Sequence, residues 1–81
     1  TSNDDIVYKI QIFTSDKQLS PENRQFKGYN EISYYVENGI YKYTYGEETD
    51  YKEIMKKFKN ASKDFKGSFI IPMKDGKRIR N

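Results

Sequence analysis

Six side chains, spaced at alternate positions in three segments, could together bind a polar polymer. They are Lys9, Gln11, Phe13, Tyr35, Lys42 and Thr44. In a β-strand, residues two positions apart lie on the same face of the sheet. If the three segments are strands of one sheet, a single face carries two cations, an amide, a hydroxyl and two aromatic rings. Such a face can stack against an extended polar chain and hydrogen-bond to it. The same pattern also suits an ordinary solvated face, which antiparallel sheets often have.

The composition excludes several kinds of site. The 81-residue chain has no cysteine and no histidine, so it has neither a disulfide scaffold nor a thiolate metal site. The commonest general base and zinc ligand is also missing. The carboxylates are scattered over predicted turns and helix starts rather than paired in a pocket. We therefore expect no catalytic residue, no metal and no cofactor, and we do not expect this domain to be an enzyme.

Length and charge indicate one small domain. We expect a single domain over residues 1–81, with a frayed polar tail at residues 1–5. The net charge of +3 is spread along the chain, so it favours an anionic partner only weakly and does not indicate a nucleic-acid-binding arm. No apolar run approaches membrane-spanning length, so we expect no membrane insertion, and we expect a monomer. Because the chain begins at Thr1 rather than at a methionine, we expect a domain of a longer, exported protein.

An Asn38-Gly39 pair between two alternating segments predicts a β-hairpin over residues 31–46. This dipeptide favours a type I′ turn, in which both central residues have positive φ. A two-residue loop then fixes the pairs Val36–Tyr41, Tyr34–Tyr43, Ile32–Tyr45, Tyr35–Lys42 and Ser33–Thr44. The tyrosines at 41, 43 and 45 share a face with Ile32 and Val36, so that face is predicted to be buried under a helix. Lys42 and Thr44 are predicted to be exposed on the other face.

Two helices are predicted. In 49–67, Asp50 and Glu53 resemble a capping box, and the apolar residues follow a helical stripe. The lysines outside this stripe are expected to form the solvated side of the helix. In 14–28, Ser20 suits an N-cap, Pro21 suits the first helical position and Gly28 suits the exit. A short helix of about two turns is therefore expected between them.

Strands over 6–13 and 68–73 complete the order of elements. Pro72 cannot donate a ladder hydrogen bond, so strand 68–73 is expected at an edge of the sheet. The order βαββαβ predicts an α+β, ferredoxin-like and RNP-like fold, with a four-stranded antiparallel sheet and two helices on one face. Right-handed crossovers place strands 6–13 and 41–46 in the centre. The face away from the helices, which carries the six side chains above, is then open.

Two segments resemble the signature strands of the SPOR (sporulation-related repeat) domain family. "YKIQIFTS" and "GIYKYTYG" are similar to the family motifs "VQVGSF" and "GLYRVRVGPF". Gln11 falls on the glutamine of the first motif, and Gly39, Tyr41, Lys42 and Gly46 fall on Gly, Tyr, Arg and Gly of the second. The stretch "ENGIYKYTYGEETDYKEI" also resembles the C-terminal segment of Bacteroidetes N-acetylmuramoyl-L-alanine amidases. The resemblance covers about residues 7 to 75.

The resemblance implies a peptidoglycan-binding module. SPOR domains prefer glycan strands stripped of stem peptides, so it also implies a location in the periplasm or cell envelope of a bacterium. The six side chains of the open face would then hold the glycan, with Lys9 and Lys42 near its carboxylates and Phe13 and Tyr35 stacked on its sugars. The amidase chemistry would lie in another part of a longer protein.

Two other functions remain open. RNA-recognition modules share the βαββαβ order and bind on the same sheet face, but the hairpin register turns the tyrosines at 41, 43 and 45 inward rather than outward. We therefore expect no nucleic-acid partner. Alternatively, the edge strand over 31–37 could accept a strand from a protein partner.

Overall fold

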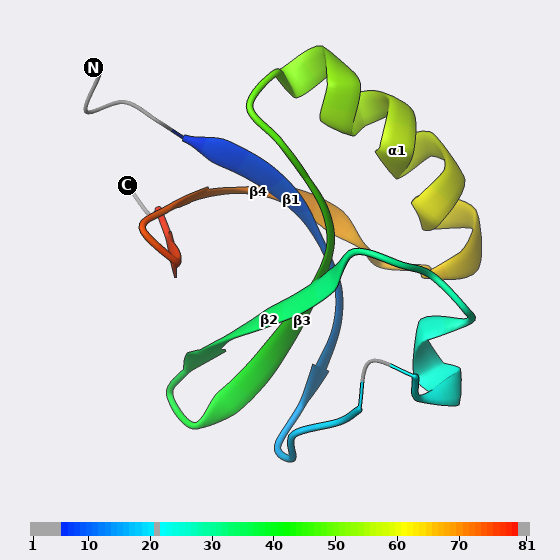
Figure 1. The fold of residues 1–81 in the computed structure, drawn as a ribbon, viewed down its shortest axis with the longest axis vertical. Coiled ribbons are helices and arrows are strands. Elements are labelled where there is room, and N and C mark those ends of the chain that lie inside the picture. Colours follow the sequence, from blue (N-terminus) through cyan, green and yellow to red (C-terminus); the bar gives the residue numbers. More distant parts are fainter. Residues whose placement is uncertain (1–5, 21, 80–81) are drawn as a thin grey trace.

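A computed structural model of the chain describes residues 6–20 and 22–79. They form a five-stranded antiparallel sheet that curls into a half-barrel, with one α-helix packed against it (Figure 1). The strands lie in the order β2-β3-β1-β4-β5. The elements are β1 (Val7–Ser15), the 3-10 turn η1 (Arg24–Phe26), β2 (Ile32–Glu37), β3 (Ile40–Glu48), α1 (Tyr51–Asp64), β4 (Phe69–Lys74) and β5 (Lys77–Arg78). The predicted tail at residues 1–5 and the predicted role of Pro21 lie outside the described residues.

The hairpin of β2 and β3 has the predicted register. Asn38 and Gly39 have φ values of 55° and 77°, as a type I′ turn requires. The pairs run from Glu37–Ile40 beside the turn to Ile32–Tyr45 at the far end. The local turn chemistry therefore decides which side chains of the hairpin share a face.

Two bulges disrupt the pairing of β1 with β3. Between the pairs Tyr8–Glu48 and Ile10–Tyr45, β3 holds one more residue than β1, and Gly46 lies there with a φ of 79°. Between Gln11–Thr44 and Phe13–Tyr43, the extra residue is Ile12 of β1. Bulges bend the strand that carries them and increase its twist. We attribute the strong curl of the sheet to these two positions.

Helix α1 forms within the predicted range. Asp50 is its N-cap, and the side chain of Asp50 accepts a hydrogen bond from the main-chain N–H of Lys52 at 2.9 Å. Ile54 and Ala61 are fully buried against the sheet. Tyr51, which the apolar stripe would also bury, is 50% exposed at the start of the helix.

The prediction of a short helix of about two turns in 14–28 is wrong, because the described residues of this segment form only the three-residue turn η1. The side chain of Asn23, rather than Ser20, caps this turn by accepting from the N–H of Gln25 at 2.9 Å. Lys27 follows with a left-handed φ of 53° and ends it. Only Phe26 of this turn is buried, so the segment has too little apolar surface to hold a longer helix against the sheet.

The predicted fold class is therefore wrong. The structure is not a four-stranded βαββαβ sheet with two helices, because one helix is missing and a fifth strand is added. Strands β1 and β3 lie in the interior of the sheet, as expected, and β2 lies at an edge. Strand β4 does not lie at an edge, so the prediction made from Pro72 is wrong. Asp75 and Gly76 turn the chain back, and Met73 of β4 pairs with Arg78 of β5. The carbonyl of Pro72 accepts a hydrogen bond from the N–H of Ile79, just after β5, at 3.0 Å. The missing donor of Pro72 therefore also lies on this side, at the end of the two-residue β5, where the loss of one ladder bond is tolerated.

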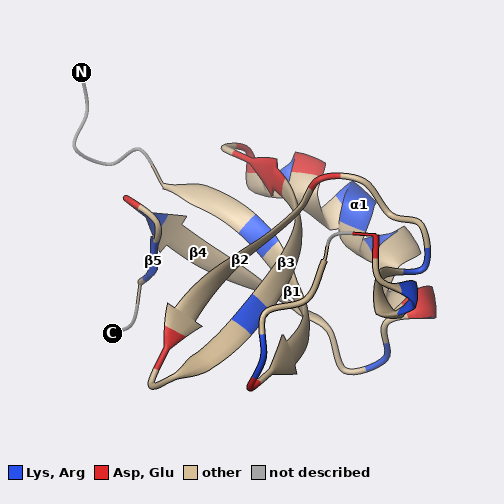
Figure 2. Ribbon diagram, turned by 60° about the horizontal axis from the view of Figure 1, so that its bottom comes forward, with Lys and Arg blue, Asp and Glu red and all other residues tan. Residues whose placement is uncertain are grey.

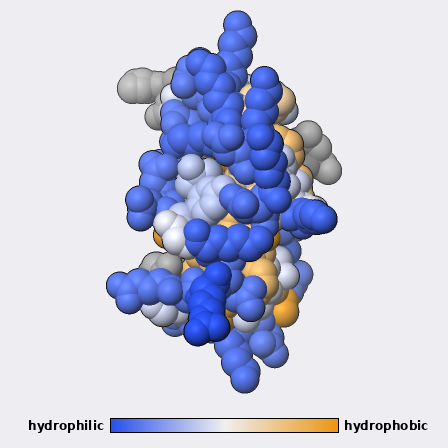
Figure 3. All heavy atoms as spheres, turned by 90° about the vertical axis from the view of Figure 1, so that its right-hand side faces the viewer, coloured by the Kyte–Doolittle hydropathy of each residue, from blue (hydrophilic) through white to orange (hydrophobic). Residues whose placement is uncertain are grey.

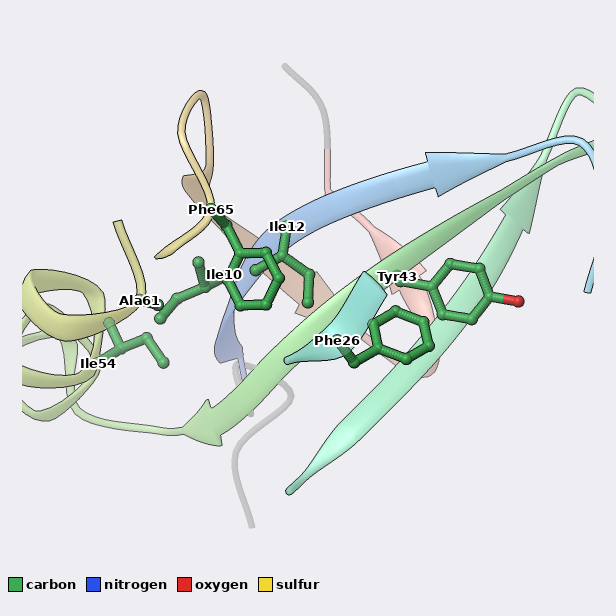
Figure 4. Close-up of a cluster of buried hydrophobic side chains, with 7 residues drawn as sticks. All are labelled: Ile10, Ile12, Phe26, Tyr43, Ile54, Ala61 and Phe65. Atoms are coloured by element: carbon green, nitrogen blue, oxygen red, sulfur yellow. The ribbon is translucent and has the colours of Figure 1, made fainter. Parts of the chain in front are cut away.

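Two apolar clusters pack on opposite faces of the sheet. On the face that meets α1, called here the helix face, the core consists of Ile10, Ile12, Phe26, Tyr43, Ile54, Ala61 and Phe65 (Figure 4). On the other face, called here the inner face, Tyr35 of β2 packs with Ile71 and Met73 of β4. A flat sheet would keep these strands too far apart for such contact, so the inner cluster depends on the curl.

Tyr43 is buried, but not by the helix. It is 2% exposed, and the ring of Phe26 from η1 lies 5.0 Å from it, centroid to centroid. Figure 4 shows these two rings together, apart from the side chains of α1. The segment between β1 and β2, rather than α1, therefore covers this part of the hairpin.

Candidate functional site

Five of the six predicted binding residues share the inner face, and one does not. The strand pairs place Gln11 beside Thr44 and Tyr35 beside Lys42, and Lys9 follows by alternation along β1. Phe13 is turned to the helix face by the bulge at Ile12. The Phe13 ring lies 6.3 Å from the rings of both Phe26 and Tyr43.

The inner face is not the open platform that the sequence predicts. Thr44 is 1% exposed, Tyr35 8% and Gln11 9%, so the predicted exposure of Thr44 is wrong. The curl folds β2 over the centre of the sheet, and the Tyr35 hydroxyl reaches across β3 to donate to Oε1 of Gln11 at 2.7 Å. A ligand cannot stack on a tyrosine ring that is already packed against Ile71 and Met73.

The polar side chains of the inner face satisfy one another. Ser33 Oγ and Thr44 Oγ1 share a hydrogen bond of 2.9 Å, and Lys9 Nζ donates to the Ser33 oxygen at 3.3 Å. Together with the Tyr35–Gln11 bond, these contacts form a continuous polar strip between apolar residues. Buried polar groups need such partners, and this strip meets that need within the fold.

Both lysines of the inner face also have acidic neighbours. Lys42 Nζ lies 2.6 Å from Glu37 Oε1, and the Lys42 side chain is 18% exposed. Lys9 Nζ lies 4.0 Å from Glu47 Oε1, and the Lys9 side chain is 17% exposed. A ligand carboxylate would have to compete with Glu37 for Lys42, so this face is poorly prepared to bind an anionic polymer.

An open groove lies instead beside the start of β2. It has a volume of about 310 Å³ and is lined by Gln18, Leu19, Ile32, Ser33, Tyr34 and Tyr43. We call it the Tyr34 groove. The Gln18 amide donates to the Tyr34 hydroxyl at 3.2 Å, and the main-chain N–H of Leu19 donates to the Tyr43 hydroxyl at 2.5 Å. These two bonds tie the segment after β1 to the hairpin and form the walls of the groove.

Tyr34 presents an aromatic surface at this groove. It is 46% exposed, and its ring is held by contacts with Tyr41 and Tyr43, at centroid distances of 5.4 and 5.6 Å. An aromatic ring, an amide and an apolar floor are the features of a small-molecule site.

Sequence reasoning missed this groove. The alternation of the hairpin places Tyr34 on the same face as the buried tyrosines. The local pattern does not reveal that this end of β2 lies outside the cover of α1 and η1. One signal was available: the segment 14–28 between the first two strands offers only two large apolar side chains, Leu19 and Phe26, as cover. A hairpin with more apolar residues than its cover can bury must expose some of them.

Basic and acidic residues are interspersed along the chain (Figure 2). Lys52, Lys56, Lys59 and Lys63 of α1 are all exposed, and the side containing α1 and η1 has a mainly hydrophilic surface (Figure 3). Lys57 differs, because its Nζ lies 2.9 Å from Glu48 and 3.1 Å from Glu31. The hydrogen bond to Glu48 is the main cause of a raised Lys57 pKa. Lys57 therefore links α1 to the start of β2 and to the end of β3, which lie together at the end of the hairpin away from the turn.

Residues 6–20 and 22–79 contain no group of three or more acidic residues placed to hold a metal ion. The same residues contain no helix that is long and apolar enough to cross a membrane.

Comparison of the chain with protein-family models, with curated proteins and with solved structures gives no match. The resemblance of its two strand motifs to SPOR domains therefore remains a prediction.

Proposed function

We propose that this domain is a non-catalytic module that binds the glycan strands of bacterial peptidoglycan, and that the Tyr34 groove holds the sugar. The observation that carries the proposal is the half-exposed Tyr34 ring at the rim of an open groove. The motif resemblance supports the ligand class. It also supports a location in the periplasm or cell envelope, as part of a longer protein such as an amidase.

The chemistry of the groove suits a sugar. A sugar ring has one apolar face, which can pack on an aromatic ring, and a rim of hydroxyls, which need donors and acceptors. The Gln18 amide and the Tyr34 hydroxyl stand together at the groove and offer both. Because the groove is open rather than enclosed, a long polymer can pass through it without a free end.

The inner face is a poorer place for the glycan than the sequence predicts. Tyr35 and Thr44 are buried, and Lys42 is paired with Glu37. The same burial argues against a nucleic-acid module of the RNP type, since those modules stack bases on exposed aromatics of the sheet. We therefore assign the glycan to the Tyr34 groove rather than to the inner face.

Binding to purified sacculi stripped of stem peptides tests the proposal. Tyr34→Ala should reduce retention about tenfold, equivalent to about 1.4 kcal/mol, because it removes the stacking surface. Tyr34→Phe should retain most binding, since it keeps the ring. Tyr51→Ala is the matched control, because Tyr51 is a tyrosine of similar exposure on α1, and it should bind like the wild type.

Two outcomes would contradict the assignment. Equal retention by Tyr34→Ala and the wild type would exclude the groove as the sugar site. Loss of retention in Lys42→Gln together with normal binding by Tyr34→Ala would place the glycan on the inner face.

A further inference from the structure

A second cleft lies where the two edges of the curled sheet approach each other. It has a volume of about 250 Å³ and is lined by Tyr35, Val36 and Glu37 of β2 and by Gly76, Lys77 and Arg78 at β5. Strands β2 and β5 are the first and last of the sheet. The cleft is therefore the gap that keeps the half-barrel from closing, and it is distinct from the Tyr34 groove.

The residues that line this cleft are consecutive on each side. Side chains of consecutive strand residues point to opposite faces of the sheet. Three consecutive residues can therefore line the same cleft only if their main chain borders it. Each side of the cleft is thus the outer edge of a strand. Edge strands present unpaired N–H and C=O groups that can pair with a further strand.

Arg78 at this cleft has one nitrogen without a hydrogen-bond partner among the described residues. The Nε of Arg78 is buried and makes no hydrogen bond to any described residue, while its guanidinium lies 5.4 Å from the centre of the Phe69 ring. Lys77 beside it is exposed. Glu37, the acidic residue of the lining, lies 2.6 Å from Lys42. An unsatisfied buried donor is costly, and a carboxylate is the acceptor that would best satisfy it.

We propose that this cleft binds an extended peptide segment carrying an acidic side chain. The segment pairs with the outer edges of β2 and β5, and its carboxylate accepts a hydrogen bond from Arg78. Main-chain pairing supplies the affinity and the carboxylate supplies the specificity, as in other cases of strand addition. This protein-binding role is independent of the proposed glycan binding, because it uses different residues.

The chemistry favours a peptide over the other occupants. A glycan lacks the regularly spaced N–H donors that pair with a strand edge. A second copy of this chain, joined through β2, would bring only the sequence Ile32–Glu37 with one acidic residue at its end. A separate acidic strand can place its carboxylate freely opposite Arg78.

Nuclear magnetic resonance titration with the peptide acetyl-TVEVTV-amide tests the proposal. Its alternating β-branched residues favour an extended chain, and acetyl-TVQVTV-amide is the uncharged counterpart. The amide signals of Val36, Glu37, Gly76 and Lys77 should shift on titration. The acidic peptide should bind about tenfold more tightly than the uncharged one, as expected for a hydrogen bond to a charged group.

Two variants distinguish a specific contact between the peptide carboxylate and Arg78 from a general attraction between opposite charges. In Arg78→Gln the two peptides should bind with equal affinity, whereas Lys59→Gln, which removes one exposed charge from α1, should keep the tenfold preference. Comparing two peptides on one variant remains informative even if Arg78→Gln loosens β5.

Three results would overturn the proposal. The first is a preference for the acidic peptide that survives in Arg78→Gln. The second is a set of shifts confined to the Tyr34 groove. The third is a concentration-dependent dimer whose formation shifts the same amides without peptide, because a second copy would then occupy the cleft.

Discussion

Gln11 and Tyr35, two of the predicted binding residues, form a hydrogen bond with each other inside the fold. The Tyr35 hydroxyl is buried and donates to Gln11 at 2.7 Å, so the amide oxygen of Gln11 is already used within the fold. Gln11→Ala should lower the free energy of unfolding by about 1–3 kcal/mol, because a buried hydroxyl loses its acceptor. Urea unfolding measures this change.

A double-mutant cycle isolates the Tyr35–Gln11 bond. In a Tyr35→Phe background there is no hydroxyl to leave unsatisfied, so Gln11→Ala should cost clearly less. An equal cost in both backgrounds would show that the bond itself contributes nothing to stability.

Tyr29 gives a second, pH-dependent prediction at the residue scale. Its hydroxyl donates to the carboxylate of Asp64, and chiefly for this reason its pKa is raised to about 12. The folded state thus favours the neutral phenol. The stability from this contact is fully present below the ordinary tyrosine pKa near 10 and is lost as the pH rises towards 12.

Ultraviolet absorbance of the tyrosinate ion measures this titration. The alkaline titration curve of the wild type minus that of Tyr29→Phe should show a single step with a midpoint near pH 12. In Asp64→Asn the step should move back towards pH 10, because the charge and the strong acceptor are gone. A step near pH 10 in the wild type would contradict the Tyr29–Asp64 contact.

At the scale of elements, Gly46 links the bulge of β3 to helix α1. It has a φ of 79°, and a Cβ placed there would lie 3.2 Å from Cδ of Lys57 and 3.4 Å from Cδ1 of Ile54. Lys57 cannot easily move away, because Glu31 and Glu48 hold its Nζ. The left-handed bulge therefore lets the helix approach the sheet closely.

Gly46→Ala should destabilise the domain by more than the backbone strain alone, which is about 1–2 kcal/mol for a left-handed residue. Gly67→Ala is the matched control, since Gly67 has a φ of 86° but no atom within 4 Å of an added Cβ. Thermal unfolding of the two variants compares them. If Gly67→Ala is the more damaging, the close approach of α1 to Gly46 is not significant.

At the scale of the whole molecule, one helix and a curl replace the two helices that the sequence predicts. The inner cluster of Tyr35, Ile71 and Met73 buries apolar surface that a second helix would not reach. The curl that makes this cluster possible also brings β2 and β5 to the two sides of one cleft. Both proposed binding sites lie along β2, which is an exposed edge of the sheet.

The sequence by itself determined the local features. Asn38 and Gly39 specify the hairpin turn and its register, and Asp50 specifies the start of α1, because turn geometry and helix capping involve only residues close together in the chain. The same local rules placed β1 and β3 as strands. They could not show whether a face of the sheet was open, since alternation identifies which residues share a face but not what covers it.

Only the tertiary structure decided the site. The bulges at Ile12 and Gly46 arise between strands far apart in sequence, and they turn Phe13 to the helix face and curl β2 over Gln11. The fate of each side chain then depends on long-range packing: Thr44 and Tyr35 are buried, while Tyr34 is left exposed beyond the reach of η1 and α1. Burial is a property of the assembled sheet and its cover, so a pattern with a period of two residues cannot encode it.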